Sequence, residues 1–252
     1  MLKIRIIPVL LYKNHGLVKG VGFRSWRRIG TAVPAIKVYE SRQVDELIFL
    51  DIAATPEERM VDHIEIDQLA DECSMPLTVG GGVRTTGDFH RLLRAGADKV
   101  SVNTGAIENP ELIDEAARLY GAQCVVASID FRRRADGCDE VYGNCGTRAA
   151  AKDPVAWARE VADRGAGEIL LTSIDRDGTM TGYDTGLIRR VAESVPVPVI
   201  AAGGAGNYEH MRQAVSDGKA DALAAASIFH FTEQTPVEAK RYLAARGFNI
   251  RI

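Results

Sequence analysis

The sequence predicts an α/β protein folded as a single (β/α)8 barrel, a TIM barrel made of two homologous half-barrels. Eight short apolar segments alternate with helical patterns, one long passage occurs twice, and the 252 residues fit one large barrel. The apolar segments are rich in Val, Ile and Leu without strict alternation. This composition is typical of parallel strands that are buried on both faces.

A long internal repeat divides the chain into two halves of similar length. Glu46 and Glu168 open similar apolar segments, and Gly81 and Gly203 stand in similar glycine loops; the members of each pair are 122 residues apart. A fixed internal period indicates a repeated architecture. We therefore expect one domain whose half-barrels comprise about residues 1–122 and 123–252.

The eight predicted strands follow from the apolar segments. Each is short, is dominated by aliphatic and β-branched side chains, and is bounded by glycine, proline or polar residues. In chain order they are Ile4–Leu11, Glu46–Ile52, Pro76–Val79, Lys99–Val102, Cys124–Asp130, Glu168–Ile174, Val197–Ala202 and Ala222–Ala226.

Helical patterns lie between these strands. Asn109 and Asp153 each stand directly before a proline, which is typical of a capping residue followed by the first helical turn. Glycines that suit helix ends follow other patterns at Gly96, Gly165, Gly218 and Gly247. The predicted helices include Asp62–Cys73, Thr86–Ala95, Pro110–Tyr120, Pro154–Arg164, Gly186–Ser194, Tyr208–Asp217 and Thr235–Arg246.

Two long segments interrupt this regular alternation. Asn14–Val33 follows the first predicted strand, and Phe131–Lys152 follows the fifth. Segments that follow strands lie at the C-terminal face of such a barrel, where its functional sites are found. We therefore expect both segments to lie near the site.

Composition excludes several classes of protein. The 31 basic and 34 acidic residues give a net charge of −3 and a pI near 6.0, which does not favour a nucleic acid as a partner. No apolar run approaches the roughly 20 residues of a membrane span, and the first residues lack the pattern of a signal peptide. Four cysteines are too few for a disulfide framework in a chain of this size. We expect a cytoplasmic protein without a membrane partner.

Glycine loops follow two of the predicted strands. Residues 80–82 are three glycines after the third strand, and Gly203-Gly204 follows the seventh. Such loops let backbone N–H groups approach an anion closely. One isolated Gly-Gly pair is more simply explained as a tight turn, but two loops at repeat-equivalent positions favour two anion sites. The sequence therefore predicts a ligand with a phosphate at each end.

Several motifs resemble those of one enzyme family. They are Arg5–Pro8, Leu17–Gly20, Asp45–Asp51, Thr78–Gly82, Gly96–Thr104, Glu168–Tyr183, Gly203–Gly206 and Ser227–His230. On these motifs the chain resembles, end to end, the cyclase subunit of imidazole glycerol phosphate synthase. The resemblance implies a two-half barrel that takes ammonia from a glutaminase and uses it to cyclise a bis-phosphorylated intermediate of histidine biosynthesis. We expect neither a cofactor nor a metal.

The resemblance also assigns residues to the two phosphate sites. It implies Gly82, Asn103 and Thr104 at one phosphate. It implies Asp177, Gly178, Gly204 and Ser227 at the other.

The first strand departs from the family at a catalytic position. In the family, one aspartate at the end of strand 1 and one at the end of strand 5 form the acid/base pair. Asp130 fills the second position, but Leu11 stands at the first. Leucine transfers no proton, and loss of a general acid or base costs about 10²–10⁴-fold in rate. Lys19 is the candidate for a group that takes over the missing role.

Four charged residues open predicted strands at the opposite end of the barrel. Arg5, Glu46, Lys99 and Glu168 begin strands 1, 2, 4 and 6, where two charges of each sign can satisfy one another. Without the resemblance, a structural plug is an equally good interpretation, because that end of a barrel normally serves stability. The resemblance implies a gate for ammonia from a docked class I glutaminase, with Asp98 beside Lys99 at the interface.

The retained gate and the impaired cyclase site together predict a paralogous role. Leu10–Lys19 and Asn144–Arg148 resemble a branch of the family found in surface-polysaccharide gene sets, where the barrel, its glutaminase and a separate amidotransferase place an amidino group on a sugar. We expect this role, with a phosphorylated sugar-type substrate. The alternatives are a working histidine-pathway cyclase, a non-catalytic ammonia conduit that activates a glutaminase, and a related phosphoribosyl isomerase, against which Leu11 counts.

Two further clusters carry weaker signals. Positive charge gathers in both long segments, at Arg24, Arg27 and Arg28, with Trp26 among them, and at Arg132–Arg134. A solvated surface is the simpler interpretation, and a lid that holds an anionic sugar nucleotide is the alternative. Cys138 and Cys145 are seven residues apart with no histidine nearby, which is not an established metal pattern.

Overall fold

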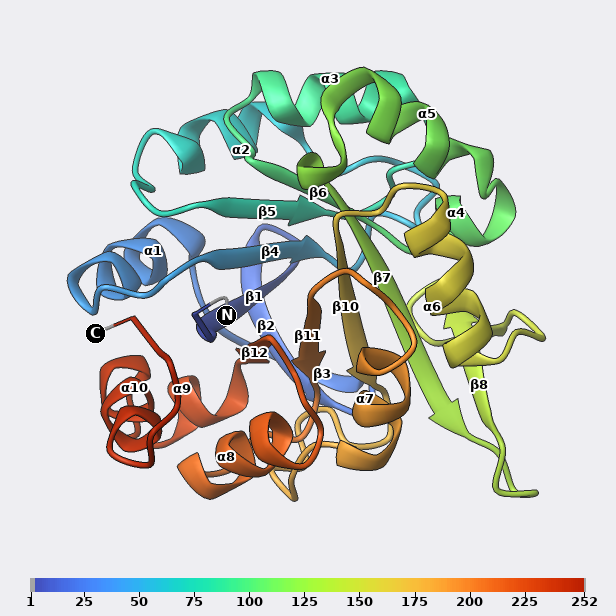
Figure 1. Cartoon of the computed structure of the whole chain (residues 1–252). Coiled ribbons are helices and arrows are strands. Elements are labelled where there is room, and N and C mark those ends of the chain that lie inside the picture. Colours follow the sequence, from blue (N-terminus) through green and yellow to red (C-terminus); the bar gives the residue numbers. More distant parts are fainter. Residues whose placement is uncertain (1–2, 252) are drawn as a thin grey trace.

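Eight parallel strands close into one barrel in the computed structural model, which describes residues 3–251 (Figure 1). Each strand pairs with its neighbours in parallel, and the pairing of β12 with β1 closes the sheet. The barrel strands are β1 (Arg5–Lys13), β4 (Leu47–Asp51), β5 (Leu77–Gly80), β6 (Lys99–Val102), β7 (Val125–Arg133), β10 (Glu168–Ser173), β11 (Val199–Ala202) and β12 (Ala222–Ala225). The predicted single (β/α)8 barrel is confirmed.

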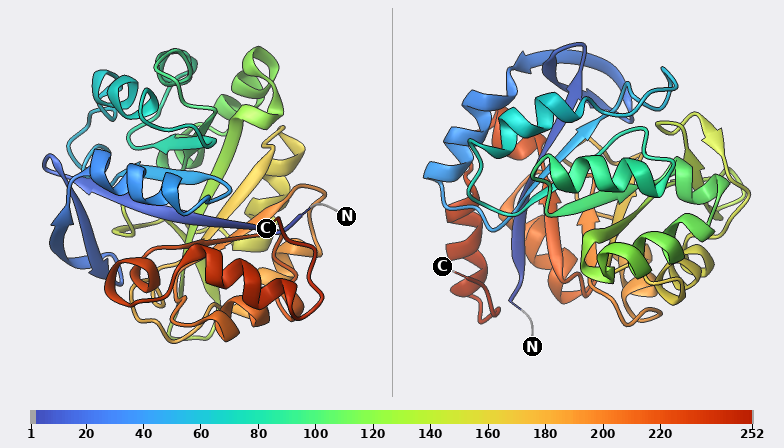
Figure 2. Two further views of the ribbon diagram at one scale, coloured as in Figure 1. Left: turned by 90° about the vertical axis from the view of Figure 1, so that its left-hand side faces the viewer. Right: turned by 90° about the horizontal axis from the view of Figure 1, so that it is seen from above.

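Helices surround the barrel on its outside (Figure 2). They are α1 (Ala32–Ser41), α2 (His63–Ala70), α3 (Thr86–Arg94), α4 (Thr104–Glu108), α5 (Glu111–Tyr120), α6 (Pro154–Asp163), α7 (Thr185–Ala192), α8 (Tyr208–Ser216), α9 (Ser227–Phe231) and α10 (Pro236–Ala244), with a 3-10 turn at Ala122–Cys124. No helix of residues 3–251 is long and apolar enough to cross a membrane.

The two predicted helix caps have different outcomes. Asp153 caps α6 as expected, because its carboxylate accepts hydrogen bonds from the backbone N–H groups of Val155 and Ala156. The prediction for Asn109 is wrong. Pro110 has helical dihedral angles and precedes α5 without a side-chain cap, and the backbone carbonyl of Asn109 accepts the bond from Leu112 N instead.

The two long segments form β-hairpins that extend barrel strands. After β1, the strands β2 (Gly16–Val21) and β3 (Arg24–Gly30) form a hairpin, and β2 pairs antiparallel with the end of β1. After β7, the strands β8 (Asp139–Gly143) and β9 (Arg148–Ala149) do the same. Because of this pairing, β1 and β7 run to Lys13 and Arg133, beyond the predicted ends Leu11 and Asp130.

The internal repeat is visible in matching contacts. Asp98 Oδ2 accepts a hydrogen bond of 2.8 Å from Leu77 N, and Asp221 Oδ2 accepts one of 3.0 Å from Val199 N. Both contacts join the start of one strand to the segment before the next strand. The short helices α4 and α9 likewise follow the strands β6 and β12 directly.

Apolar packing forms two separate clusters. The larger one lies between the barrel and its helices. The smaller one fills the inside of the barrel with Ile7, Ile48, Val126, Leu170, Ile200, Ala202, Ala222 and Ala224. This inner cluster separates the two ends of the barrel, so the charged groups at each end are held apart by apolar side chains.

A buried ion pair fastens the last helix to the first strands. Lys240 Nζ on α10 lies 2.8 Å from Asp45 Oδ1, and both side chains are less than a tenth exposed. Asp45 Oδ2 also accepts a hydrogen bond from Ile6 N of β1, and Lys240 Nζ donates to Gln43 O. The pair therefore joins the C-terminal part of the chain to β1 and to the start of β4.

Replacement of Lys240 tests how much this ion pair contributes to the stability of the fold. Lys240→Met leaves the carboxylate of Asp45 buried without its cation, so we expect the free energy of unfolding to fall by about 3–5 kcal/mol in a urea titration. Arg241→Met, at the next and exposed position of α10, is the control and should change it by less than about 0.5 kcal/mol. Equal losses in both variants would contradict the assignment.

Candidate active site

A cavity of about 140 Å³ opens at the C-terminal ends of the barrel strands. Seven of the predicted site residues line it, namely Leu11, Lys19, Gly82, Asn103, Thr104, Asp130 and Asp177. Gly178, Gly204 and Ser227 each stand one residue beyond a lining residue. The cavity therefore brings together side chains that lie far apart in the sequence.

Asp130 is held in place by neighbours on β6 and β10. Asn103 Nδ2 donates a hydrogen bond of 3.2 Å to Asp130 Oδ2, and also to the backbone carbonyls of Ser128 and Tyr142. Burial raises the pKa of Asp130 to about 7, a hydrogen bond from Thr172 opposes this, and the charge of Asp177 adds to it. Asp130 can therefore both give and take a proton near neutral pH.

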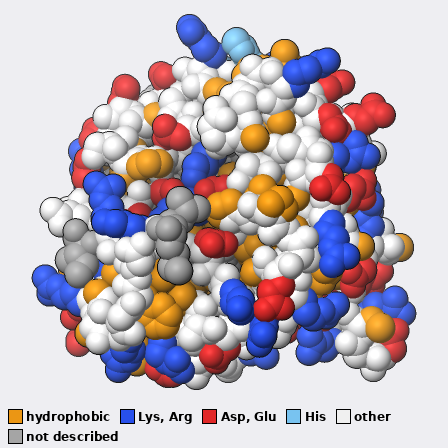
Figure 3. All heavy atoms as spheres, in the orientation of Figure 1, with side chains coloured by type: hydrophobic (Ala, Val, Ile, Leu, Met, Phe, Trp, Pro, Cys, Tyr) orange, Lys and Arg blue, Asp and Glu red, His pale blue; other side chains and the backbone are white. Residues whose placement is uncertain are grey.

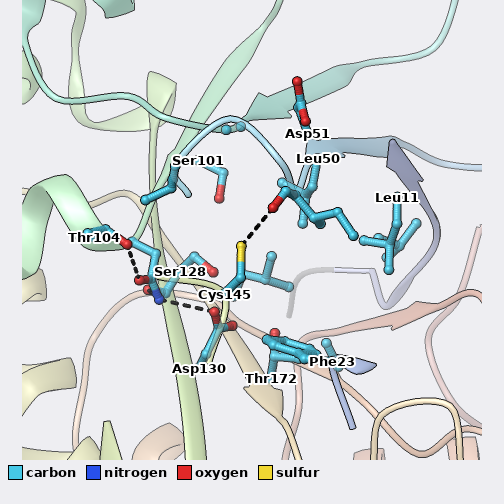
Figure 4. A pocket seen from close by; sticks show the side chains of 18 of the residues that line it. Leu11, Phe23, Leu50, Asp51, Ser101, Thr104, Ser128, Asp130, Cys145 and Thr172 are labelled. Carbon is cyan, nitrogen blue, oxygen red and sulfur yellow. Dashed lines mark hydrogen bonds between the residues drawn. The ribbon is translucent and has the colours of Figure 1, made fainter. Parts of the chain in front are cut away.

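Leu11 belongs to an apolar wall of the same cavity. It pairs in register with Leu50 of β4 and with Val18 of the hairpin, and its side chain is buried. Figure 4 shows Leu11 and Asp130 on opposite sides of Cys145. Val9, Leu170, Ala202 and Ala224 extend the apolar lining. The β1 side of the cavity thus offers no group that can transfer a proton.

The charges of Lys19 and Asp177 interact where the β2–β3 hairpin contacts the loop after β10. Gly22 N of the hairpin donates a hydrogen bond of 2.9 Å to the backbone carbonyl of Asp177, which docks the hairpin on the loop after β10. Lys19 is buried, and burial lowers its pKa while Asp177 opposes that change. Burial raises the pKa of Asp177, and the positive charge of Lys19 opposes this rise. Asp177 Oδ2 is buried and has no hydrogen-bond partner among the described residues.

The glycines of the predicted anion sites are also places of close backbone contact. A Cβ atom at Gly82 would lie 1.8 Å from the carbonyl oxygen of Arg59, and one at Gly178 would lie 2.1 Å from that of Gly20. Both glycines have positive φ, at 67° and 75°. Packing alone therefore requires glycine here, whether or not an anion binds.

Thr104 and Cys145 connect the second hairpin to the cavity. Thr104 Oγ1 accepts a hydrogen bond of 2.8 Å from Asn144 N and donates to Asn103 Oδ1. The thiol of Cys145 donates to the carbonyl of Ile52, which follows β4, so the turn after β8 reaches across the mouth. Burial raises the pKa of Cys145 to about 12, which keeps the thiol protonated.

The arginine, tryptophan and cysteine residues of the two long segments have different surroundings. Trp26 lines the cavity, Arg27 stacks on the Phe231 ring at 3.8 Å, and Arg28 donates to the carbonyl of His15. In the second segment, Arg132, Arg133 and Arg134 pair with the carboxylates of Asp175, Asp139 and Asp136, respectively. Cys138 is a free, exposed cysteine, and residues 3–251 hold no cluster of three or more His, Cys, Asp or Glu suited to a metal ion.

The four predicted gate residues form a closed ring at the other end of the barrel. Arg5 Nη1 lies 2.7 Å from Glu46 Oε1 and 2.7 Å from Glu168 Oε1. Lys99 Nζ lies 3.0 Å from Glu46 Oε2 and 3.0 Å from Glu168 Oε2. Burial acts against the charge of Arg5, but the two glutamates raise its pKa. Asp98, next to Lys99, is exposed.

Sequence reasoning missed several residues that shape the cavity. Thr172 acts on Asp130, Phe23 lines the cavity, and Asp51 lies at its edge in an ion pair of 2.6 Å with Arg59. Thr172 stands in register with Asp130 in the β7–β10 pairing, which is the one signal that could have identified it. Phe23 depends on the hairpin, which the sequence pattern does not predict.

Comparison with protein families gives a match over most of the chain. The sequence model of the family described as "Histidine biosynthesis protein" matches residues 5–235. The match includes all eight barrel strands and the whole lining of the cavity. It indicates a barrel enzyme of the histidine biosynthesis type. The chain therefore belongs to the histidine biosynthesis protein family.

Proposed function

We propose that the protein is the ammonia-using synthase subunit of a glutamine amidotransferase complex of the imidazole glycerol phosphate synthase type. Its substrate is a phosphorylated sugar-type molecule, and its role is paralogous to histidine biosynthesis, in amidino-sugar formation for surface polysaccharides. The observation that carries the proposal is the contrast between the two ends of the barrel. The charged ring around Arg5 is complete, whereas Leu11 leaves the cavity without the carboxylate that the family reaction uses.

The charged ring formed by Arg5, Glu46, Lys99 and Glu168 supports the proposal that ammonia enters at this end of the barrel. Its two glutamates each contact both cations, so the four charges are satisfied within the end of the barrel. The face of the molecule that Figure 3 shows has acidic, basic and apolar side chains intermingled. A mixed surface of this kind suits a protein partner, which we propose is a class I glutaminase that contacts Asp98 and Lys99.

The loops at the cavity support a substrate with two anionic groups. Gly82, Asn103 and Thr104 follow β5 and β6, and Gly178, Gly204 and Ser227 follow β10, β11 and β12. Ser227 and Thr104 each begin a short helix directly after a strand. Asp177 stands beside the second group, but its carboxylate would repel a phosphate while ionised.

The second candidate is a working cyclase of histidine biosynthesis. The observation that favours it is Asp130, whose pKa of about 7 suits proton transfer and whose carboxylate is held by Asn103. A non-catalytic ammonia conduit is the outcome in which the glutaminase responds to the barrel but no variant of the barrel turns over substrate.

Anion binding tests the proposed substrate class. In crystals soaked in sulfate, we expect two bound anions at the mouth, one at Gly82, Asn103 and Thr104 and one at Gly178, Gly204 and Ser227, because their backbone N–H groups can converge on an oxyanion. Crystals soaked in chloride alone provide the reference density. Density at neither position would exclude the two-anion proposal.

Addition of the barrel to its glutaminase tests the proposed partner. We expect the glutaminase rate to rise when the barrel is added, because a docked partner can shift the glutaminase toward its active conformation. Asp98→Asn should weaken the interaction. Asp136→Asn, an exposed change on the turn before β8 at the opposite end, should leave it unchanged. A glutaminase rate that does not change when the barrel is added would contradict the proposed entry of ammonia at this end of the barrel.

Leu11 tests the paralogous role. We expect the wild type to show at most a trace of ammonia-dependent cyclase activity on the histidine-pathway substrate at high ammonium and alkaline pH, because β1 supplies no proton-transfer group. Leu11→Asp should raise this rate by about 10-fold or more, since a positioned acid or base is worth about 10²–10⁴-fold.

The matched control is Leu11→Asn, which introduces a polar side chain of similar size that cannot transfer a proton. It should leave the rate at the wild-type trace. Wild-type turnover at the level of an ordinary cyclase would instead establish the second candidate.

A further inference from the structure

We propose that Asp177 supplies the second proton-transfer group of the cavity, in place of the carboxylate that β1 lacks. This inference rests on the proposed function, in which ammonia reacts with a substrate bound in this cavity. It assigns Asp177 a role in chemistry in place of a contact with the second phosphate, because an ionised carboxylate would repel that phosphate.

The argument begins with the carboxylates that line the cavity, which are Asp51, Asp130 and Asp177. Both oxygens of Asp51 already have partners, because Oδ1 accepts hydrogen bonds from the backbone N–H groups of Ala53 and Ala54 and Oδ2 pairs with Arg59. Asp130 Oδ2 accepts a hydrogen bond from Asn103. Only Asp177 has a buried carboxylate oxygen with no partner among the described residues.

A buried polar oxygen without a partner is unusual in a folded protein and requires an explanation. We assign this oxygen to a ligand group, because Asp177 lines the cavity. The oxygen can accept a hydrogen bond from an N–H or O–H group of a molecule in the cavity.

The surroundings keep Asp177 able to act as a base. Lys19 approaches from the hairpin and favours the ionised carboxylate, while burial favours the protonated form. The backbone of Asp177 is fixed at both ends, since its N–H donates to Ser173 O and its carbonyl accepts from Gly22 N. The side chain is therefore held beside Lys19 by the docked hairpin.

Asp130 and Asp177 are close enough for the charge of one to raise the pKa of the other. Two such carboxyl groups can share acid and base work. Ammonia attacks a carbonyl carbon of the substrate, and a C–N bond forms as the π electrons move to oxygen. Asp130 gives its proton to that oxygen, and Asp177 takes one proton from the nitrogen. The product is a neutral carbinolamine, and solvent restores the two protonation states without any redox reagent.

The test compares Asp177→Asn in two backgrounds. Ammonia-dependent turnover of the histidine-pathway substrate is measured at high ammonium without glutaminase. In the wild-type background we expect Asp177→Asn to lower the residual rate by about 100-fold or to the detection limit. In the Leu11→Asp background the same change should cost less than about 10-fold, because the new carboxylate on β1 resumes the role.

Asp175→Asn is the matched control. Asp175 lies two residues away on the same loop, is exposed and pairs with Arg132, so this change should leave both rates unaltered. Thermal unfolding of all variants checks that they are folded.

Two results would overturn the role of Asp177. One is an equal rate for the wild type and Asp177→Asn, including the case in which neither rate is measurable. The other is an equal loss in both backgrounds, which a purely structural role would produce. Failure of the proposed function looks different, because the wild type would then turn over this substrate at the level of an ordinary cyclase, or Leu11→Asp would also be inactive on it.

Discussion

The pairing of β12 with β1 is the constraint on which both ends of the molecule depend. It joins Arg5 to Ala222 and Pro8 to Ala225 in register, and so closes the sheet around the inner apolar cluster. Once the sheet is closed, residues at the starts of the strands meet at one end and residues at their ends meet at the other. The charged ring and the cavity are thus two results of one pairing register.

The cavity is chemically divided between two sides. Its polar groups, among them Ser101, Asn103, Ser128, Asp130 and Thr172, come from β6, β7 and β10 or the residues that follow them. The facing lining, from β11, β12, β1 and β4, is aliphatic except for Asp51 at the end of β4, whose carboxylate pairs with Arg59. A low-dielectric wall strengthens the electrostatic interactions of the polar side, which accounts for the raised pKa of Asp130. Lys19 and Asp177 also line the cavity, and they add one basic and one acidic side chain where the β2–β3 hairpin meets the loop after β10.

The strands and most helices could be predicted from the sequence because their signal is local. A buried parallel strand requires a short aliphatic run, and the repeat placed strand ends such as Gly81 and Gly203 at one face. The positions of Asp130 and of the four ring residues at strand ends followed from this pattern. Their roles in ammonia use remain proposals.

The features that could not be predicted depend on contacts between distant segments. The hairpin after β1 forms through antiparallel pairing and through the bond from Gly22 to Asp177, and neither leaves a periodic pattern in the sequence. The unpartnered oxygen of Asp177 and the thiol bond of Cys145 to Ile52 are likewise results of three-dimensional packing. Only Thr172 had a signal, through its register with Asp130.

The ring at the N-terminal end is held together twice, once by each of its cations. Arg5 and Lys99 each bridge Glu46 and Glu168, so a rotation of Lys99 away from the ring would leave the contacts of Arg5 with both carboxylates in place. The opened ring would carry one more negative than positive charge, whereas the closed ring is neutral. Lysine suits this movement, because its ammonium is a compact charge on a flexible stem and the planar arginine is better at holding two carboxylates. Arg5 would therefore keep the two carboxylates in place, while the position of Lys99 would set the net charge at this end of the barrel.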